Sequence, residues 1–422
     1  MSIELIFVAL FIIYFFLIWR AGKTFPILEL FFFIYFIQYI FSTYLIYNNY
    51  PQLESWMPVK EDEYFGNAIP AMAFLFGGAF LFGKNINLRP LLMNIETDKA
   101  VKLGYFLLAI SYTMSILPLI GISLFNSILS FTSFLKYVGA FCFLFSTNRF
   151  RFLIITLVYI QSLTEAFAGA IFVDFFIWTT YLFFILILKF RFPFWLRASF
   201  IVLAAPVLIL IQGSKSEYRK ATWTGKKETG LNTFSELAAA KNLKNADAPF
   251  IESDGVVKTV GRLTQGWHFG LTMRWVPRRE PWSDGKEMVS DIASSLLPRV
   301  LFSDKKLAAT QDKFRKYTGY KLRNSTSMTI GVLGDFYVNF GPAGSLIMLF
   351  IYGVVIAKFL QFFITRFVIP DPINIIWIPF MFNYLVRANN DFYTGLNCIV
   401  KGFLIFVLIN WLKKRLWKES QA

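Results

Sequence analysis

The sequence is poor in histidine and cysteine. Its 422 residues include one histidine, His268, and two cysteines, Cys142 and Cys398. Both cysteines lie inside apolar stretches, so we expect no framework of disulfides. One histidine and two distant cysteines cannot form the usual ligand set of a zinc site. These low counts argue against a disulfide-stabilised secreted domain, and we expect neither a metal site nor a cofactor.

Motifs for nucleotide and hydrolytic chemistry are missing as well. The segment closest to a phosphate-binding P-loop, Gly225-Lys226-Lys227, lacks a glycine at Lys220 and a Ser or Thr at Lys227. The sequence contains no HExxH, no GxSxG and no Asp-x-Asp pair. It therefore offers no recognisable site for a nucleotide or a nucleotide-sugar donor.

Apolar residues, in contrast, are abundant. Hydrophobic residues make up 56% of the chain and include 51 Phe. They come in blocks close to the length, about 20 residues, that a helix needs to cross a bilayer. We predict an all-α polytopic membrane protein with about eleven transmembrane helices and one large extracytoplasmic loop. The expected spans are 3–19, 25–47, 65–83, 105–124, 128–147, 153–167, 171–188, 198–212, 342–363, 373–389 and 394–412.

Two of these spans depend on interpretation. The first block, Ile3–Trp19, has no basic segment before it, so we interpret it as a true span and not as a cleaved signal peptide. The apolar stretch 152–188 is too long for one helix, and we divide it near Ala168-Gly169. Without this division the chain would have ten spans.

Basic residues are distributed unevenly between the alternating short loops. If the chain crosses the membrane eleven times, successive short loops lie on alternate sides of it. The loops on one side hold nearly all the Lys and Arg of the short loops, whereas those on the other side hold only Lys60 and Arg387. By the positive-inside rule the side with the basic loops is cytoplasmic. The N-terminus is then outside and the C-terminus is cytoplasmic, as an odd number of spans requires. This topology explains part of the net charge of +16, and we expect no nucleic acid partner.

The same alternation divides the chain into three parts. These are a transmembrane bundle (1–212), an extracytoplasmic loop (213–327) and a second transmembrane bundle (328–422). The loop is the only long polar segment, and it is rich in Lys and Arg. Because the positive-inside rule acts weakly on long loops, topology does not explain this charge. We expect a short helix at Thr233–Leu243 and an amphipathic turn at Asp291–Leu297.

Loop arginines are the first candidates for a binding site. Arg262, Arg274 and Arg278 lie in the same segment as several tryptophans. The planar guanidinium matches phosphate oxygens in a two-pronged contact, which suits an anionic ligand such as a lipid pyrophosphate. Alternatively, these arginines contact anionic lipid headgroups or are simply solvated.

His268 and Asp335 are candidates for proton transfer. His268 is either an acid/base or hydrogen-bonding group or a structural residue. Asp335 lies where the chain re-enters the membrane, where an unpaired carboxylate is costly. It is either a general base or the partner of a loop arginine. The same cost makes charged residues inside the expected spans functional candidates; these are Lys136, Glu165, Asp174 and Lys401. Alternatively, Lys136 and Lys401 extend their charged ends to the membrane interface.

One part of the chain resembles a known family. The run Leu297-Pro298-Arg299-Val300-Leu301-Phe302-Ser303-Asp304-Lys305-Lys306 is followed by Tyr317-Thr318-Gly319 and by Gly334-Asp335-Phe336-Tyr337-Val338-Asn339-Phe340-Gly341. These segments resemble the Wzy-type oligosaccharide repeat-unit polymerases of bacterial surface polysaccharide pathways, which are related to O-antigen ligases. The likeness is close from Gln265 to Gly341. Asp335 stands in place of the family's commoner Glu, and the family's prolines near Ser303 and Leu307 are missing.

The resemblance implies a multi-span, GT-C-like glycosyltransferase of the bacterial cytoplasmic (inner) membrane. It would transfer a glycan from undecaprenyl pyrophosphate onto a new lipid-linked repeat unit, with membrane lipids and a chain-length regulator as partners. Arginines can stabilise a leaving pyrophosphate without a metal. The expected catalytic residues are Asp335, His268 and Arg299. The expected substrate-binding residues are Arg262, Arg274, Arg278, Lys305, Tyr337 and Asn339.

Three other functions stay open. A ligase would transfer the same glycan to a different acceptor. A transporter or flippase would concentrate polar residues near the middle of its spans, whereas this chain concentrates them in the loop. The third is a non-catalytic scaffold of an envelope assembly, which nothing in the sequence excludes.

We predict that a topology reporter fused at Gly255 reads extracytoplasmic, because the charge alternation places the long loop outside. Alkaline phosphatase activity of the fusion measures this. A second fusion after Ala422 is the control and is expected to read cytoplasmic. A cytoplasmic signal at Gly255 would overturn the orientation.

Overall fold

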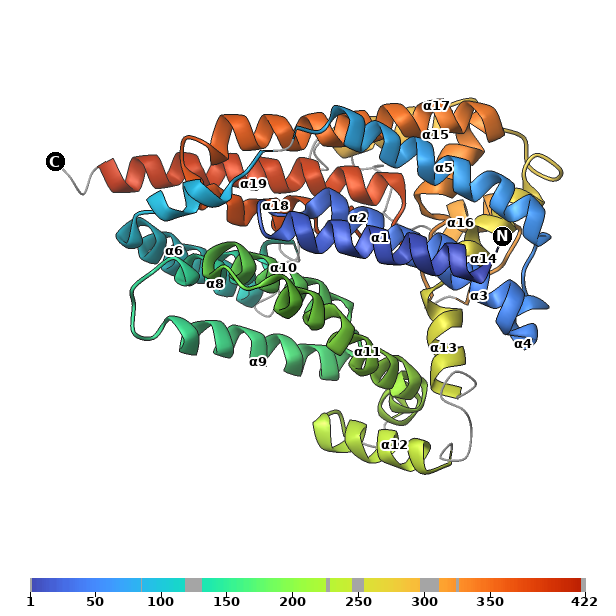
Figure 1. Ribbon diagram of the computed structural model, residues 1–422, viewed down its shortest axis with the longest axis horizontal. Helices are drawn as coiled ribbons and strands as arrows, with labels where there is room; N and C mark the ends of the chain where they lie inside the picture. Colours follow the sequence, from blue (N-terminus) through green and yellow to red (C-terminus); the bar gives the residue numbers. More distant parts are fainter. Residues whose placement is uncertain are drawn as a thin grey trace.

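The computed structural model describes residues 2–84, 86–117, 131–224, 228–244, 254–296, 311–323 and 326–418. Within these ranges every regular element is a helix, which confirms the all-α prediction. One large hydrophobic core takes side chains from helices along the whole chain. Figure 1 shows the helices of this core lying roughly along a common direction.

Seven helical segments in the described ranges are long and apolar enough to cross a membrane. This supports a helical membrane protein. The segments are α1 (Ile3–Ala21), the continuous run of α2 (Ile27–Tyr35), η1 (Phe36–Phe41) and α3 (Ser42–Asn49), α5 (Glu61–Phe82), α9 (Arg151–Gly169), α10 (Val173–Phe190), α17 (Gly331–Phe363) with η5 (Ile364–Val368), and α19 (Phe392–Lys418).

The other expected spans coincide with helices that are shorter or less apolar. These are α6 (Thr97–Ile116), α8 (Leu135–Leu144), the first part of α11 (Phe194–Trp223), and η6 (Pro372–Ile376) with α18 (Trp377–Phe382). Each of the eleven expected ranges therefore overlaps a helix, while the number of membrane crossings stays a prediction.

The apolar stretch after residue 152 is broken where the sequence analysis divides it. α9 ends at Gly169, and Ala170 adopts the left-handed conformation with φ of 50°. The Ile171 amide donates to the Ala166 carbonyl oxygen, 3.0 Å away, which is the pattern that closes helix ends. α10 then begins at Val173, so the stretch forms two helices.

The described residues between α11 and α17 form five helices. They are α12 (Leu231–Lys244), α13 (Asp254–Leu263), α14 (Gly266–Trp275), α15 (Lys286–Leu296) and α16 (Gln311–Thr318). α12 and α15 occupy the places of the expected helix and amphipathic turn. α11 itself continues through residue 213 to Trp223.

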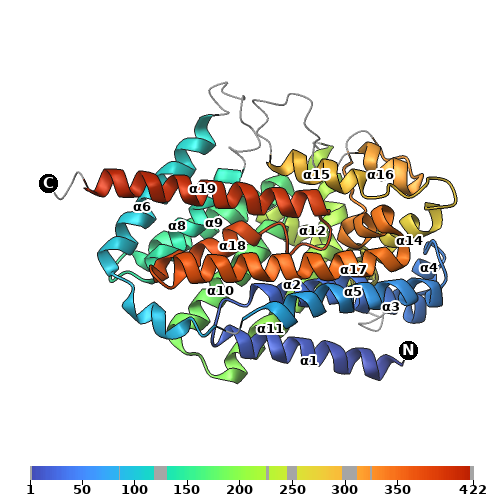
Figure 2. The ribbon, with the colours of Figure 1, turned by 90° about the horizontal axis from the view of Figure 1, so that it is seen from above.

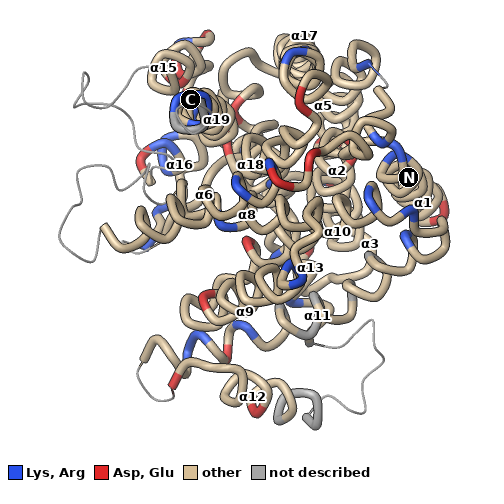
Figure 3. The backbone as a smooth tube through the Cα atoms, turned by 90° about the vertical axis from the view of Figure 1, so that its left-hand side faces the viewer, with Lys and Arg blue, Asp and Glu red and all other residues tan. Residues whose placement is uncertain are grey.

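The two chain ends lie at opposite ends of the molecule. The N-terminus lies at the same end as α13, α14 and α16, and the C-terminus lies at the other end (Figure 1). Figure 3 views the molecule from the C-terminal end. A short helix, η2 (Arg89–Asn94), connects α5 with α6, and α4 (Pro51–Glu54) follows α3.

α5 and α17 run side by side (Figure 2). Glycines allow their close approach, because a Cβ at Gly78 would overlap the Phe350 carbonyl oxygen and a Cβ at Gly353 would overlap that of Leu75. Further along, Gly341 has φ of 68° and is followed by Pro342, which kinks α17. The pair is therefore in close backbone contact near Gly78 and Gly353, and α17 changes direction at Gly341.

We predict that Gly78→Ala lowers the free energy of unfolding by about 1–3 kcal/mol, because the added methyl group forces two backbones apart. Thermal unfolding of the purified chain in detergent measures this. Gly77→Ala is the matched control, since nothing lies within 4 Å of a Cβ there, and better helix propensity is expected to leave that variant as stable as the parent or more so. Equal stability of the two variants would contradict the close-approach argument.

Candidate functional site

A buried lysine connects the loop helices to α17. Lys313 of α16 places its Nζ 2.8 Å from Oδ1 of Asp335 and 3.0 Å from Oδ2 of Asp291. The three side chains are 13%, 1% and 3% exposed. Burial by itself lowers the pKa of Lys313, but the two carboxylates outweigh this effect and raise the pKa above its ordinary value. Lys313 is therefore a permanent cation between α15 and α17.

Asp335 also holds the beginning of α19. Its second oxygen, Oδ2, accepts a hydrogen bond from the Phe392 amide at 2.8 Å. Asp391 accepts one from the Thr394 amide at 2.8 Å through Oδ1. Carboxylates at a helix N-terminus are favourable because they satisfy free amides and face the positive end of the helix dipole. Asp335 thus meets the expectation of an ion pair, although its partner is a lysine and not an arginine.

Asn339 lies one turn beyond Asp335 and fastens the start of α15. Its Oδ1 accepts hydrogen bonds from the Ser283 hydroxyl at 2.7 Å and from the Met288 amide at 3.1 Å. Its Nδ2 donates to the Asp335 carbonyl oxygen at 2.8 Å. The side-chain oxygen and nitrogen of Asn339 therefore both bond to other residues of the protein. In this structure Asn339 positions α15 and does not form an exposed binding surface.

α16 presents Lys313 to the carboxylates through its buried face. Phe314, Tyr317 and Thr318 are buried on this helix, and Lys313 lies one turn before Tyr317 on the same side. Gly319 ends the helix with φ of 68°, and the Trp275 ring packs where its Cβ would be. The apolar face formed by Phe314 and Tyr317 was the sequence feature that could have identified Lys313 as a buried residue. The sequence analysis counted Lys313 only among the many basic residues of the loop.

A cavity of about 250 Å³ lies on the other side of α17, against α5. Tyr337 lines it, whereas Asp335 does not. Two residues along a helix correspond to a rotation of about 200°, so these side chains point in opposite directions. The structure therefore separates two residues that the sequence analysis assigned to one site.

The cavity combines an apolar wall with a few polar groups. Residues from α5, α14 and α17 line it: Gly66, Asn67, Pro70, Ala71, Phe269, Leu333, Tyr337, Pro342, Ala343, Ser345 and Leu346. Gly66, Pro342 and Ala343 are exposed, so the cavity opens on the side of the helix pair. It lies beside the kink of α17 at Gly341 and Pro342.

Aromatic and charged residues lie near Tyr337 at this cavity. The Trp282 and Phe269 rings have centroids 5.0 and 5.8 Å from that of Tyr337. Arg278 and Glu63 are close enough to interact electrostatically with the Tyr337 hydroxyl. Arg278 is itself exposed, as is Arg274 on α14. The structure thus brings Tyr337 and Arg278 together among the predicted site residues.

His268 lies on α14 and faces α16. Both ring nitrogens are buried and have no hydrogen-bond partner among the described residues. The Phe314 ring lies 5.8 Å away. Burial lowers the pKa of His268 to about 4, so the imidazole is neutral at pH 7. It neighbours the Lys313 helix and does not line the cavity.

The remaining predicted residues lie elsewhere. Arg262 is exposed on α13 and interacts electrostatically with Glu217 of α11. Arg299 and Lys305 lie outside the described residues.

Three of the charged residues expected inside spans, Lys136, Glu165 and Asp174, form ion pairs. Lys136 lies 2.6 Å from Glu165, which joins α8 to α9. Arg387 lies 2.5 Å from Asp174, which joins the segment before α19 to α10. These contacts give the four residues a structural role.

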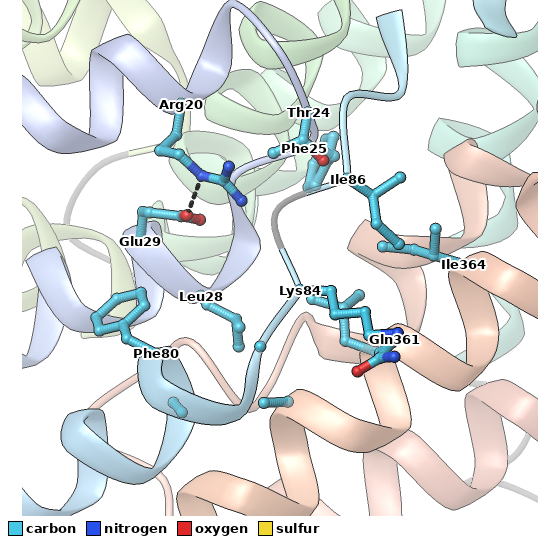
Figure 4. Close-up of a pocket in the computed structure, with 14 residues that line it drawn as sticks. Arg20, Thr24, Phe25, Leu28, Glu29, Phe80, Lys84, Ile86, Gln361 and Ile364 are labelled. Atoms are coloured by element: carbon cyan, nitrogen blue, oxygen red, sulfur yellow. Dashed lines mark hydrogen bonds and ion pairs between the residues drawn. The ribbon is translucent and has the colours of Figure 1, made fainter.

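A second, smaller cavity lies among helix ends at the C-terminal end of the molecule. It has a volume of about 40 Å³ and is lined in part by Arg20, Glu29, Lys84 and Gln361 (Figure 4). Arg20 Nε lies 2.6 Å from Oε1 of Glu29. This space holds a few waters at most, and none of the predicted site residues lines it.

We predict that Lys313→Met lowers the free energy of unfolding by about 3–5 kcal/mol, because it leaves Asp335 and Asp291 buried without their cation. Thermal unfolding and proteolysis within residues 286–318 measure the effect. Lys316→Met is the matched control, since Lys316 is 45% exposed and pairs with Glu287 at 3.1 Å, so it should cost less than about 1 kcal/mol. Equal losses in both variants would show that the buried pair does not hold the loop.

Comparison with known proteins places the chain in a family. No curated protein and no solved structure matches it. A family model described as a domain of unknown function, DUF8712, matches residues 30–416. The match covers most of the chain, from α2 to the end of α19. The chain therefore belongs to the DUF8712 family.

Proposed function

We propose that this protein polymerises undecaprenyl-pyrophosphate-linked oligosaccharide repeat units into a surface polysaccharide at the outer face of the bacterial cytoplasmic membrane. The proposal includes eleven spans, an extracytoplasmic loop at residues 213–327, an outside N-terminus and a cytoplasmic C-terminus. The observation that carries it is the sideways-opening cavity between α5 and α17, which Phe269 of the loop helix α14 also lines.

The cavity matches the two chemical parts of a lipid-linked donor. Its apolar wall, open at Gly66, Pro342 and Ala343, is suited to part of a polyisoprenyl chain entering from the bilayer. Arg274 and Arg278 are exposed in the same loop segment as Phe269, and Arg278 interacts electrostatically with Tyr337 at the cavity. Both guanidinium groups can contact pyrophosphate oxygens as paired donors. Tyr337 and Trp282 provide aromatic surfaces for sugar rings beside it.

The reaction is a substitution at the donor's anomeric carbon. A hydroxyl oxygen of the acceptor sugar forms the new glycosidic bond, the bond from that carbon to the pyrophosphate oxygen breaks, and undecaprenyl pyrophosphate leaves with the electron pair. The hydroxyl proton passes to a phosphate oxygen of the departing undecaprenyl pyrophosphate. Cations fixed before the reaction stabilise the charge that develops on the leaving oxygen, and we assign this role to Arg299 with Arg278.

The contacts of Asp335 and His268 argue against either residue acting as a general base. Both oxygens of Asp335 are occupied, by Lys313 and by the Phe392 amide, so Asp335 acts as a positioning residue that holds the loop over α17. His268 is neutral, with a pKa of about 4, which is too low for an efficient base at neutral pH. We assign it a positioning role, because its ring nitrogens are buried, it does not line the cavity, and its ring packs α14 against Phe314 of α16.

Two of the alternative functions can be compared with the polymerase on these observations. A transporter needs polar groups within its spans that are free to bind cargo. Here Lys136 pairs with Glu165, and Asp174 pairs with Arg387. A ligase would use the same donor site and differ only in its acceptor. The distribution of product lengths therefore separates polymerase from ligase, and a chain-length regulator would be a partner of the polymerase alone.

We predict that Arg299→Ala leaves single lipid-linked repeat units accumulating while long polymer disappears. Loss of one charge-stabilising donor typically slows such a step by about 100-fold or more. Incubation of membranes with a radiolabelled undecaprenyl-pyrophosphate-linked repeat unit, followed by gel separation of the products, measures this. Arg366→Ala is the control, because Arg366 is exposed beyond α17 at the C-terminal end.

Three outcomes of this assay are distinguishable. A ladder of products that requires Arg299 but not Arg366 supports the polymerase. One transfer to an added acceptor, without a ladder, identifies a ligase. Polymer of normal length from Arg299→Ala would remove Arg299 from the mechanism.

A further inference from the structure

Three arginines meet at the C-terminal end of the molecule, far from the cavity between α5 and α17. Arg89 begins η2, Arg191 follows the last residue of α10, and Arg197 lies in the first turn of α11. They come from connections that are distant in the sequence. Figure 3 shows this end of the molecule, with Lys and Arg positions in blue.

The turn at Gly22 brings two of the guanidinium groups together. Arg89 Nη1 donates a hydrogen bond to the Gly22 carbonyl oxygen at 3.2 Å. The Arg197 guanidinium packs directly against Gly22, in the space that a Cβ would need. Arg197 Nε donates to the Phe192 carbonyl oxygen at 2.6 Å, which holds the side chain in place. Both cations are therefore fixed around one small residue.

Arg191 completes the arginine cluster (Arg89, Arg191 and Arg197). Its Nη2 lies 3.9 Å from the Met93 sulfur in η2, which directs it toward the helix that Arg89 begins. Burial lowers the pKa of Arg89, and the positive charges of Arg191 and Arg197 lower it further. The three cations thus repel one another, and their closeness is costly without an anion.

No carboxylate compensates this charge in the described part of the chain. None of the ion pairs between described residues includes Arg89, Arg191 or Arg197. Nε and Nη2 of Arg89 are buried and have no hydrogen-bond partner there. The positive-inside rule explains basic residues in short loops. It does not explain two buried donors without an acceptor.

We propose that the arginine cluster binds a phosphate group. Guanidinium groups donate pairs of hydrogen bonds to phosphate oxygens, and basic pockets between helices on the cytoplasmic side of a membrane bind phosphorylated lipid headgroups. Trp195, which lies between Arg191 and Arg197 in the sequence, is 69% exposed, as expected of a membrane-interface tryptophan. This neighbour favours an anionic phospholipid over free phosphate. The proposal does not depend on the polymerase function.

Native mass spectrometry of the full chain in detergent tests the site. The protein is titrated separately with dioleoyl phosphatidylglycerol, dioleoyl phosphatidylcholine and inorganic phosphate. We expect phosphatidylglycerol to bind the parent chain most tightly, and Arg89→Gln and Arg191→Gln each to weaken it about tenfold, the effect of losing one charge-assisted contact. Arg366→Gln is the matched control, because it removes the same charge from an exposed position at the same end.

The arms of the experiment separate the sources of the phosphate. Tight binding of phosphatidylglycerol that needs Arg89 and Arg191 supports a lipid site. Binding of inorganic phosphate with the same dependence supports a site for free phosphate. Unchanged affinity in both cluster variants, or an equal loss in Arg366→Gln, would overturn the proposal. Because Arg191 is exposed, its variant also keeps the test valid if Arg89→Gln fails to fold.

Discussion

Lys313 carries a positive charge into the protein interior, and the position of the loop depends on its contacts with Asp335 and Asp291. A buried cation is costly unless carboxylates surround it, so α15, α16 and α17 must come together in one arrangement. Asp335 extends this constraint to α19 through the Phe392 amide. The contacts of Lys313, Asp335 and Asp291 therefore join the loop helices to α17 and to the beginning of α19.

The helix pair α5 and α17 has the opposite character, because it is held by close backbone contact and not by charge. Glycines at positions 78 and 353 allow the two backbones to touch, and Gly341 with Pro342 turns α17 away beyond that point. The lateral cavity follows from this geometry. It opens on the side of the helix pair, and Phe269 of α14 lines it from the loop.

The two ends of the molecule present different chemistry. At the end with the loop helices, the exposed Arg278 lies near Tyr337, which packs against Trp282 and lines a largely apolar cavity. At the other end, the arginine cluster concentrates positive charge around Gly22. An anionic group would stabilise both ends, and at the first end a cavity of about 250 Å³ lies beside Tyr337.

The sequence by itself determined the helical class of the protein, the places of its apolar helices and the break between α9 and α10. These are local properties, since hydropathy and helix ends depend on residues within a few turns of one another. The sequence also identified Asp335 as a residue needing a partner. Only the tertiary structure decided that this partner is Lys313, because the ion pair depends on how the loop folds back onto α17. The same folding placed Tyr337 in the cavity and Asp335 on the opposite face of the helix, since a side chain's surroundings are set by contacts between segments far apart in the chain.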